Sequence, residues 1–373
     1  MKHRYTYLLI SLVVFQFHTV LGQTTKLSND FLAIGVGARA HGMGNAQVAS
    51  IGDVTAGYWN PAGLVHIDSA FQVGAMHAEW FAGIANYDFL SFAKPLRRSR
   101  KSAIGLSVIR MGIDNIPNTF NLVSPDGTIN YDNVTEFSAT DYAILLSYAR
   151  QLKNPNWSVG GNAKVIRRII GKFGSAWGFG FDLGVQYRKG NWMFGLVGRD
   201  ITSTFNAWTF NYTENEKIVL ANTGNDIPTS SQEITVPRFV LAAAYQRQFG
   251  QQVSLLAEVN FDFTLDGQRN VLISSKNFNV DPHMGIELGY KQFLYLRGGI
   301  NNIQNALNDI DGKTKELTMQ PNFGVGLRLG RFRIDYALTD IGDVSQVLYS
   351  HIFSLVFDLK RKKRKKRAVM LSE

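Results

Sequence analysis

The side chains that most often carry out catalysis are sparse in this sequence of 373 residues. It contains no cysteine, which excludes thiolate nucleophiles, disulfides and cysteine-ligated metals. Five histidines follow residue 22, and no two stand at the spacing at which one element holds a metal ion; they are His41, His66, His77, His283 and His351. The sequence therefore offers no histidine metal centre.

Two patterns come closer to a chemical site. Residues 35–40 (Gly-Val-Gly-Ala-Arg-Ala) match the loose glycine pattern of dinucleotide-binding loops, but the βαβ unit that such a loop requires is missing. Glu258 and Asp262 share one face of a predicted strand, where two carboxylates can serve acid–base catalysis or join an ion network. Basic residues on the same predicted face favour the network. We therefore expect no enzyme activity, no cofactor and no metal.

The composition favours β-structure. Hydrophobic residues make up 45% of the chain and aromatic residues 12%, which excludes intrinsic disorder. The 35 glycines argue against a helical protein, because glycine destabilises helix interiors while aromatic residues prefer strands.

The formal charge of +10 lies mostly at the chain ends. Lys2 and Arg4 fall in a predicted export signal, and residues 360–367 are all basic. Without these residues and Glu373, residues 23–359 are close to electrical balance, so the body has no basic field for nucleic acid. The basic tail, residues 360–373, is expected to meet an anionic membrane surface or an acidic partner, or to be a solvated end.

Residues 1–22 have the form of a secretory signal peptide. A basic start is followed by a short apolar stretch beginning at Leu8 and by small residues before Gln23. An uncleaved membrane anchor is the alternative, which the short apolar stretch disfavours. The sequence predicts export from the cytoplasm.

Beyond Gln23, apolar residues alternate with small or charged residues at a period of two. From Trp177 to Tyr187, for example, large apolar side chains occupy every odd position and small or polar residues every even one. This pattern, bracketed by aromatic residues, is typical of outer-membrane barrels; a soluble β-sandwich is the alternative. We predict an all-β fold, a transmembrane antiparallel β-barrel of about 14 strands, near residues 70–80, 84–94, 101–112, 139–151, 156–169, 176–188, 191–200, 237–249, 252–264, 282–292, 293–301, 317–330, 331–339 and 347–359.

The connections predict the orientation of this barrel. Short turns alternate with long polar loops at about 113–138, 201–236, 265–281 and 302–316. Outer-membrane barrels keep short turns in the periplasm and long loops outside. We therefore expect an outer-membrane protein in contact with outer-membrane lipid, with both termini periplasmic.

The segment before the first strand lacks alternation and is rich in glycine and alanine. We expect residues 23–67 to fold into the lumen as a hatch, so that the domains are a signal peptide (1–22), the hatch (23–67), the barrel (68–359) and the tail (360–373). Interleaved lumenal charges would pair around it; they are Lys164, Asp182, Arg199, Glu258, Asp262, Glu287, Arg328, Arg333 and Asp335. An open diffusion porin is the alternative.

Two blocks in this segment, residues 37–45 and 58–64, carry a family resemblance. The first contains Arg39, Gly42, Met43 and Gly44; the second contains Tyr58, Trp59, Asn60, Pro61 and Gly63. Together they resemble the N-terminal signature of the PorV/PorQ family of Bacteroidota outer-membrane proteins, which are related to the FadL fatty-acid transporters. Glycine permits positive φ and close backbone approach, and Asn60 can cap the turn that Pro61 fixes. We expect these residues to latch the hatch rather than to contact a ligand.

The resemblance implies two functions. The first is an accessory barrel of the type IX secretion system that binds or scaffolds cargo or partner proteins through loops 113–138 and 201–236. The second is a FadL-like transporter of a hydrophobic ligand such as a fatty acid, which the Ala62-Gly63 pair fits at least as well, since PorV proteins more often show Ala-Lys there. Neither function involves nucleic acid.

Overall fold

The computed structural model describes residues 28–80, 83–96, 101–124, 126–227, 230–307, 315–339 and 350–359. The predicted signal peptide (1–22), residues 23–27 of the predicted hatch and the basic tail (360–373) lie outside these residues, as do both chain termini. Within the described part of the chain, no helix is long and apolar enough to cross a membrane.

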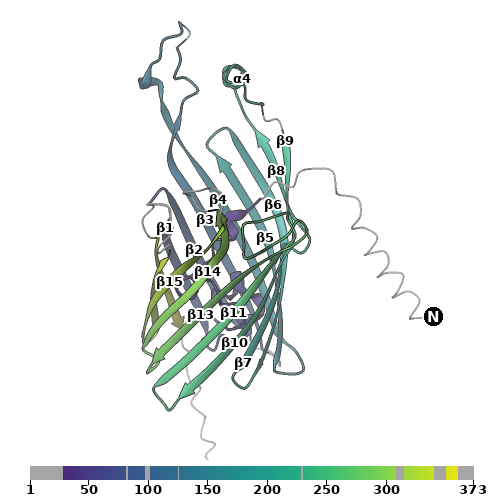
Figure 1. The fold of residues 1–373 in the computed structure, drawn as a ribbon, viewed down its shortest axis with the longest axis vertical. Helices are drawn as coiled ribbons and strands as arrows, with labels where there is room; N and C mark the ends of the chain where they lie inside the picture. The colour runs from purple at the N-terminus through teal and green to yellow at the C-terminus, as the bar shows by residue number, and fades with distance from the viewer. Residues whose placement is uncertain are drawn as a thin grey trace, which may run out of the picture.

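The described chain forms one antiparallel sheet that closes on itself where β1 pairs with β17 (Figure 1). The strands of the first half are β1 (Phe71–Trp80), β2 (Ala85–Leu96), β3 (Ser102–Asn118), β4 (Thr135–Gln151), β5 (Trp157–Ile170), β6 (Gly174–Lys189), β7 (Trp192–Arg199) and β8 (Thr204–Phe210). Those of the second half are β9 (Ser230–Thr235), β10 (Arg238–Phe249), β11 (Val253–Thr264), β12 (Ile273–Ser274), β13 (Asn279–Tyr290), β14 (Leu294–Leu307), β15 (Lys315–Leu329), β16 (Phe332–Thr339) and β17 (Ser350–Leu359).

These segments make a barrel of 14 strands, which confirms the predicted fold class. β7 and β8 lie end to end along β6, and β9 and β10 lie end to end beside them, so each pair is one strand interrupted by a break. β12 is a two-residue addition to β13. Every strand pairs with its neighbour in the chain, as in an up-and-down barrel.

The wall is apolar outside and small or polar inside. On β6, Trp177, Phe179, Phe181 and Leu183 are at least half exposed, while the alternate residues face inward and are buried. Aromatic pairs gather at the short-turn end, where Trp157 contacts Tyr187, Trp192 contacts Tyr245 and Phe332 contacts Phe357. A continuous apolar exterior with an aromatic border suits a bilayer rather than water.

Residues 28–67 lie inside the barrel and form four short helices (Figure 1). These are η2 (Asp30–Leu32), α2 (Ala38–Gly42), α3 (Ala56–Trp59) and η3 (Pro61–His66). α2 packs against β14 to β17, and η3 packs against β2 to β6 on the other side of the lumen. This segment therefore supplies much of the buried core.

The segment touches the wall where the wall has glycines. A Cβ on Gly160 would lie 2.6 Å from the backbone of Pro61 and Ala62, and one on Gly195 would lie 2.7 Å from the carbonyl oxygen of Val48. Three further wall glycines, Gly74, Gly105 and Gly184, face side chains of the segment, and another three, Gly285, Gly299 and Gly324, face its backbone. Backbone thus packs on backbone, which only glycine permits.

Ion pairs add a second set of attachments. Arg39 binds Glu287 of β13 at 2.8 Å, and Arg333 of β16 binds Asp53 at 2.5 Å. Arg297 of β14 joins these pairs by binding both Glu287 (2.6 Å) and Asp335 (2.8 Å). Burial alone would raise the pKa of Asp53, but the charges of Arg333 and Arg39 outweigh it and lower that pKa to about 2.

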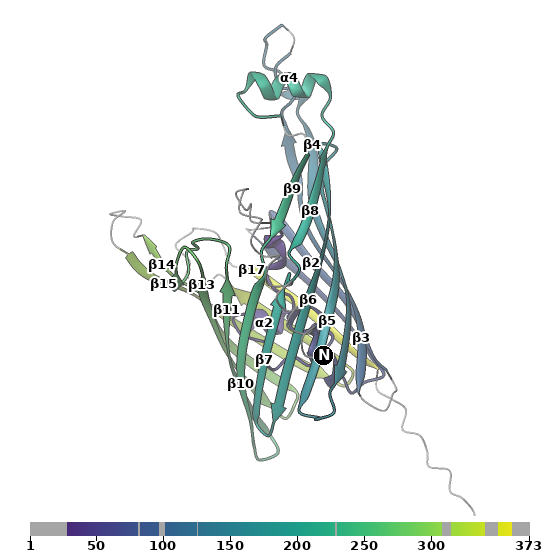
Figure 2. The ribbon, with the colours of Figure 1, turned by 90° about the vertical axis from the view of Figure 1, so that its right-hand side faces the viewer.

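The predicted loops 113–138 and 201–236 are wrong in part, because strands continue into them. β3 extends to Asn118 and β4 begins at Thr135, so their connection shortens to a tip that contains η4 (Tyr131–Asn133). Region 201–236 contains β8, α4 (Glu214–Asn222) and β9. Figure 2 shows β4, β8 and β9 rising above the rest of the barrel with α4 at the top. Side-chain alternation fades at the far ends of β3 and β4 but persists along β8.

The glycine contacts predict a position-specific cost of adding side chains. Gly299→Val would place a Cβ within the backbone of Met43 and Gly44, whereas Gly298→Val adds one where nothing lies within 4 Å. We expect the first change to destabilise the barrel by about 3 kcal/mol or more and the second by far less. Urea unfolding of the two variants in the same detergent measures the difference; equal midpoints would contradict the packing described here.

Candidate functional site

Six aromatic rings line the loop side of the barrel in a connected series, which we call the aromatic ladder. Neighbouring centroids are 5.7 Å apart between Trp208 and Phe210, 6.3 Å between Phe210 and Tyr212, and 5.9 Å between Tyr212 and Phe173, with interplanar angles of 8°, 12° and 21°. Phe120 and Phe137 extend the series, with centroids 5.2 and 5.1 Å from that of Phe173. Offset rings at these separations attract one another.

Strand geometry explains the ladder. Alternation along β8 puts Trp208 and Phe210 on its inward face, and the chain continues in the same direction to Tyr212. Phe173 comes from the turn between β5 and β6, and Phe120 and Phe137 come from the ends of the extended β3–β4 hairpin. Trp208 and Phe173 are buried, whereas the other four rings are partly exposed. The partly exposed rings present an aromatic surface at the loop side.

The wall is interrupted just below the ladder. Four residues, 200–203, separate β7 from β8, and they face only two residues, Val236 and Pro237, between β9 and β10. Pro237 has no N–H to donate, which prevents a regular ladder of hydrogen bonds there. Asp200 and Ser203 adopt positive φ angles of 53° and 56°, as the ends of the bulge require.

The break turns Asp200 into the lumen. Its carboxylate binds the ammonium of Lys164 at 2.6 Å, and Lys164 also binds Asp182 at 2.8 Å. The backbone N–H of Asp200 donates to Asp182 at 2.9 Å. The side chain of Lys164 is only 4% exposed, so one buried cation holds two carboxylates together at the break.

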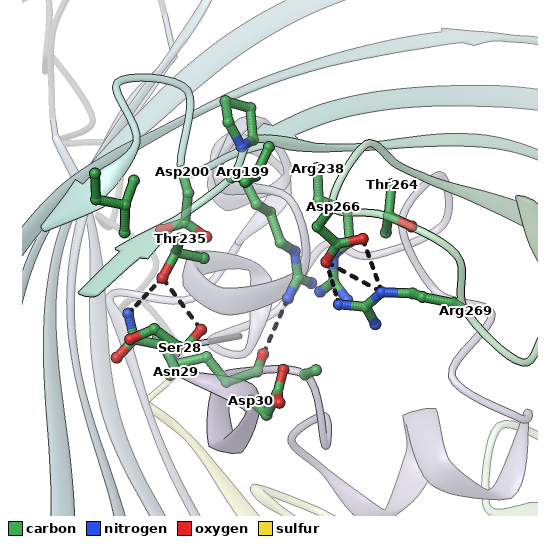
Figure 3. A pocket seen from close by; sticks show the side chains of 15 residues that line it. Ser28, Asn29, Asp30, Arg199, Asp200, Thr235, Arg238, Thr264, Asp266 and Arg269 are labelled. Atoms are coloured by element: carbon green, nitrogen blue, oxygen red, sulfur yellow. Dashed lines mark hydrogen bonds and ion pairs between the residues drawn. The ribbon is translucent and has the colours of Figure 1, made fainter. Parts of the chain in front are cut away.

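A small polar cavity of about 60 Å³ lies beside the break (Figure 3). Asn29 donates to the Thr235 hydroxyl at 2.8 Å, and this hydroxyl donates to the carbonyl of Ser28 at 3.1 Å. Arg199 donates to the carbonyl of Leu32. On the other side, Arg269 binds Asp266. The start of the lumenal segment is therefore tied to β9, the strand that follows α4.

The residues predicted from the first signature block pack against β13 to β15. Arg39 binds Glu287 through both Nε and Nη2. Gly42 lies against Gly324, and Met43 lies between Gly285 and Gly299. Gly44 has a φ of +60° and approaches the backbone of Ile300, whereas Gly42 lacks the positive φ that was expected as one of its roles.

The residues of the second block bind the segment itself and β5 and β6. Tyr58 donates to the carbonyl of Leu32 at 2.7 Å, and Trp59 donates to that of Val36 at 2.8 Å. Asn60 accepts from the N–H of Ala62 and donates to the carbonyl of Val185, so it caps η3 and also reaches β6. Pro61 begins η3 against Gly160 and Gly184, and Gly63 meets the Ile51 carbonyl without a positive φ.

The predicted carboxylate pair is divided between two sets of partners. Glu258 accepts hydrogen bonds from the N–H groups of Ala49 (2.7 Å) and Ser50 (3.1 Å), whereas Asp262 lies 3.8 Å from Arg238. Neither carboxylate is placed to exchange protons with the other. Among the described residues, no group of three or more histidines and carboxylates is arranged to hold a metal ion.

Several residues of the site were missed by sequence reasoning. Asp200 stands at the end of a predicted strand, and Arg297 occupies an inward position on β14 that alternation marks as lumenal. The inward series Trp208, Phe210 and Tyr212 is visible as alternation within the predicted loop 201–236. Its contact with Phe173 depends on the register between β6 and β8.

Comparisons with known proteins show the fold. No family model matches the sequence, and no curated protein matches it significantly. The toluene transporter TbuX of Ralstonia pickettii is 14% identical, with a TM-score of 0.52 over 87% of this chain and 98% of its own. The toluene transporter TodX of Pseudomonas putida is 13% identical, with a TM-score of 0.55 over 88% of this chain and 99% of its own. A FadL homologue of Pseudomonas aeruginosa is 14% identical, with a TM-score of 0.52 over 87% of this chain and 98% of its own.

The stabilising role of the buried Lys164 ammonium at the break can be tested by substitution. Lys164→Met would leave the carboxylates of Asp182 and Asp200 without their shared partner, which we expect to cost about 3–5 kcal/mol of stability. Lys189→Met, at the exposed end of β6, is the matched control and should change stability by less than about 0.5 kcal/mol. Urea unfolding midpoints report both; a Lys164→Met midpoint equal to that of the control would refute the role of this cation.

Proposed function

We propose that this protein resides in the outer membrane and takes up hydrophobic small molecules, which it captures on the aromatic ladder. The observation that carries the proposal is the ladder itself: partly exposed rings converge at the loop side from strands far apart in the sequence. Rings of this kind bind planar or aliphatic apolar compounds through burial and stacking.

The comparisons support this proposal over secretion. TbuX and TodX are toluene transporters, and CymD, which is 14% identical with a TM-score of 0.53, is a monoaromatic hydrocarbon channel. All three share a barrel of this shape across almost their whole length. The apolar exterior and aromatic border of this chain support placement in a membrane.

The lumenal segment acts as the hatch in this proposal, residues 23–67 forming one functional unit. Because wall glycines hold it closely, a captured molecule has no straight path through the centre of the barrel. The break at residues 200–203 is next to the ladder and interrupts the hydrogen bonding of the wall, so we assign to it the opening through which a captured molecule passes the segment.

Removing rings from the ladder tests the proposal. We expect the double change Phe210→Ala and Tyr212→Ala to reduce uptake of a radiolabelled monoaromatic compound by cells about tenfold or more, because each ring contributes about 1 kcal/mol of contact. Tyr131→Ala, which removes a ring that is 76% exposed outside the ladder, is the control. Equal uptake by both variants at equal surface expression would exclude the ladder as the capture site.

A second candidate function, binding or scaffolding of protein partners in type IX secretion, is favoured by the projecting hairpins. Apolar residues are exposed there, with Val123 60%, Ile129 62% and Ile218 57% exposed. Exposed apolar side chains beyond the bilayer commonly mark a protein interface.

Shortening the β3–β4 tip separates the two functions. If the chain scaffolds proteins, replacing residues 121–132 by a short Gly-Ser turn should abolish recovery of partner proteins in a crosslinked pull-down from native membranes while uptake persists. Mass spectrometry of the recovered proteins measures this. Recovery of no partner by the intact chain would leave uptake as the sole proposed function.

A further inference from the structure

The turn side of the lumen contains a polar cavity of about 730 Å³, at the opposite end from the aromatic ladder. The lumenal segment contributes Ser50, Gly52, Asp53 and His66 to its lining, and Ser69 follows just before β1. Strand ends at the short turns contribute Arg188, Arg328 and Arg333. The function proposed above assigns no role to this cavity.

Arg188 is the one of these arginines without a carboxylate partner within 4 Å among the described residues. Its Nη2 donates to the carbonyls of Ser50 (3.0 Å) and Ile51 (2.5 Å), and its Nε is buried without a hydrogen-bond partner. The carboxylate of Glu258 also attracts it, but that carboxylate accepts from the N–H groups of Ala49 and Ser50. The guanidinium of Arg188 thus keeps one N–H, that of Nε, without an acceptor among the described residues.

Two further groups in the cavity lack hydrogen-bond partners among the described residues. They are Nε2 of His66 and the hydroxyl of Ser69, which is nine-tenths buried. His66 lies beside Arg188, because a Cβ on Gly52 would be 3.1 Å from the Cβ of His66 and 3.4 Å from Nη2 of Arg188. Burial, with the positive charges of Arg188 and Lys101, lowers the pKa of His66 to about 3, so its ring is neutral and serves as a hydrogen-bonding group.

Most of the remaining charges in the cavity are matched; among the described lining residues the exception is Asp68, an exposed carboxylate without an ion pair. Arg333 binds Asp53, Arg328 lies 3.6 Å from Asp358, and Arg39 binds Glu287. Gln72 also donates to Asp358. Arg188, His66 and Ser69 thus line one cavity, and each carries a polar group without a hydrogen-bond partner among the described residues, which favours an anion over a cation.

We propose that this cavity binds a phosphate group through Arg188, with His66 and Ser69 as additional donors. A tetrahedral phosphate offers several acceptor oxygens to donors that approach from different elements, and guanidinium groups match its geometry. The cavity is at the end where short turns meet the periplasm in the orientation proposed here, so the phosphate belongs either to a soluble compound or to a phospholipid headgroup.

Titration of the full chain in detergent with inorganic phosphate tests the site by calorimetry. We expect Arg188→Gln to weaken binding about tenfold or more and Ser69→Ala about threefold, since a charged group contributes more than a single hydroxyl. Arg247→Gln, which removes an exposed arginine from outside the cavity, is the charge-matched control and should bind as the unmodified chain does. If Arg188→Gln fails to fold, the phosphate affinity of Ser69→Ala tests the site instead. The Ser69 hydroxyl makes no hydrogen bond among the described residues, so its removal should not disturb folding.

Native mass spectrometry distinguishes the two sources of phosphate. Retention of phospholipid by the unmodified chain, reduced in Arg188→Gln or Ser69→Ala, assigns a headgroup; calorimetric binding of inorganic phosphate without retained lipid assigns a soluble ligand. Both results support the site. If neither ligand distinguishes the unmodified chain from these variants, the proposal is overturned. Uptake of hydrophobic compounds is measured separately, so its failure leaves this result intact.

Discussion

The close approach of two backbones, that of the lumenal segment and that of the wall, is the constraint on which this structure depends. Glycines on the wall remove the side chains that would otherwise separate the two, as at Gly160 beside Pro61 and at Gly195 beside Val48. The contact holds the segment at particular positions of the wall, because a shifted segment would meet side chains where these glycines leave room. The lumen is consequently a packed interior for much of its height rather than a water-filled pore.

Charge reinforces this position in a way that suits a low-dielectric interior. Arg297 joins Glu287 and Asp335, and these carboxylates receive Arg39 and Arg333 from either side. Each charge of this cluster has a partner, which avoids the cost of an isolated ion. Glu258 and Arg188 act differently. Glu258 accepts from the N–H groups of Ala49 and Ser50, and Arg188 donates to the carbonyls of Ser50 and Ile51, so the two side chains hold consecutive peptide units from two sides of the wall.

Much of the barrel could be predicted from the sequence, because a lipid-facing wall imposes alternation at every position; β6 is the clearest case. The break between β7 and β8 could not be predicted, because alternation shows which face of the sheet a side chain is on but not how neighbouring strands are aligned. The capping box of α4, formed by Thr213 and Glu216, is legible in the sequence but does not show that the helix stands above the barrel. The aromatic ladder and the polar cavity at the turn side depend on strands meeting at particular heights, which the sequence of one strand does not encode.

The pairing of β1 with β17, from Phe71 opposite Leu359 to Glu79 opposite His351, constrains the order of assembly. The lumenal segment is synthesised before any strand, yet the seam that encloses it needs the last strand of the barrel. The segment must therefore already lie on the concave side of the sheet before β1 and β17 pair. If the segment lay on the convex side when β1 paired with β17, the barrel would close around an empty lumen. The glycines and charged side chains of its inner wall would then have no partners.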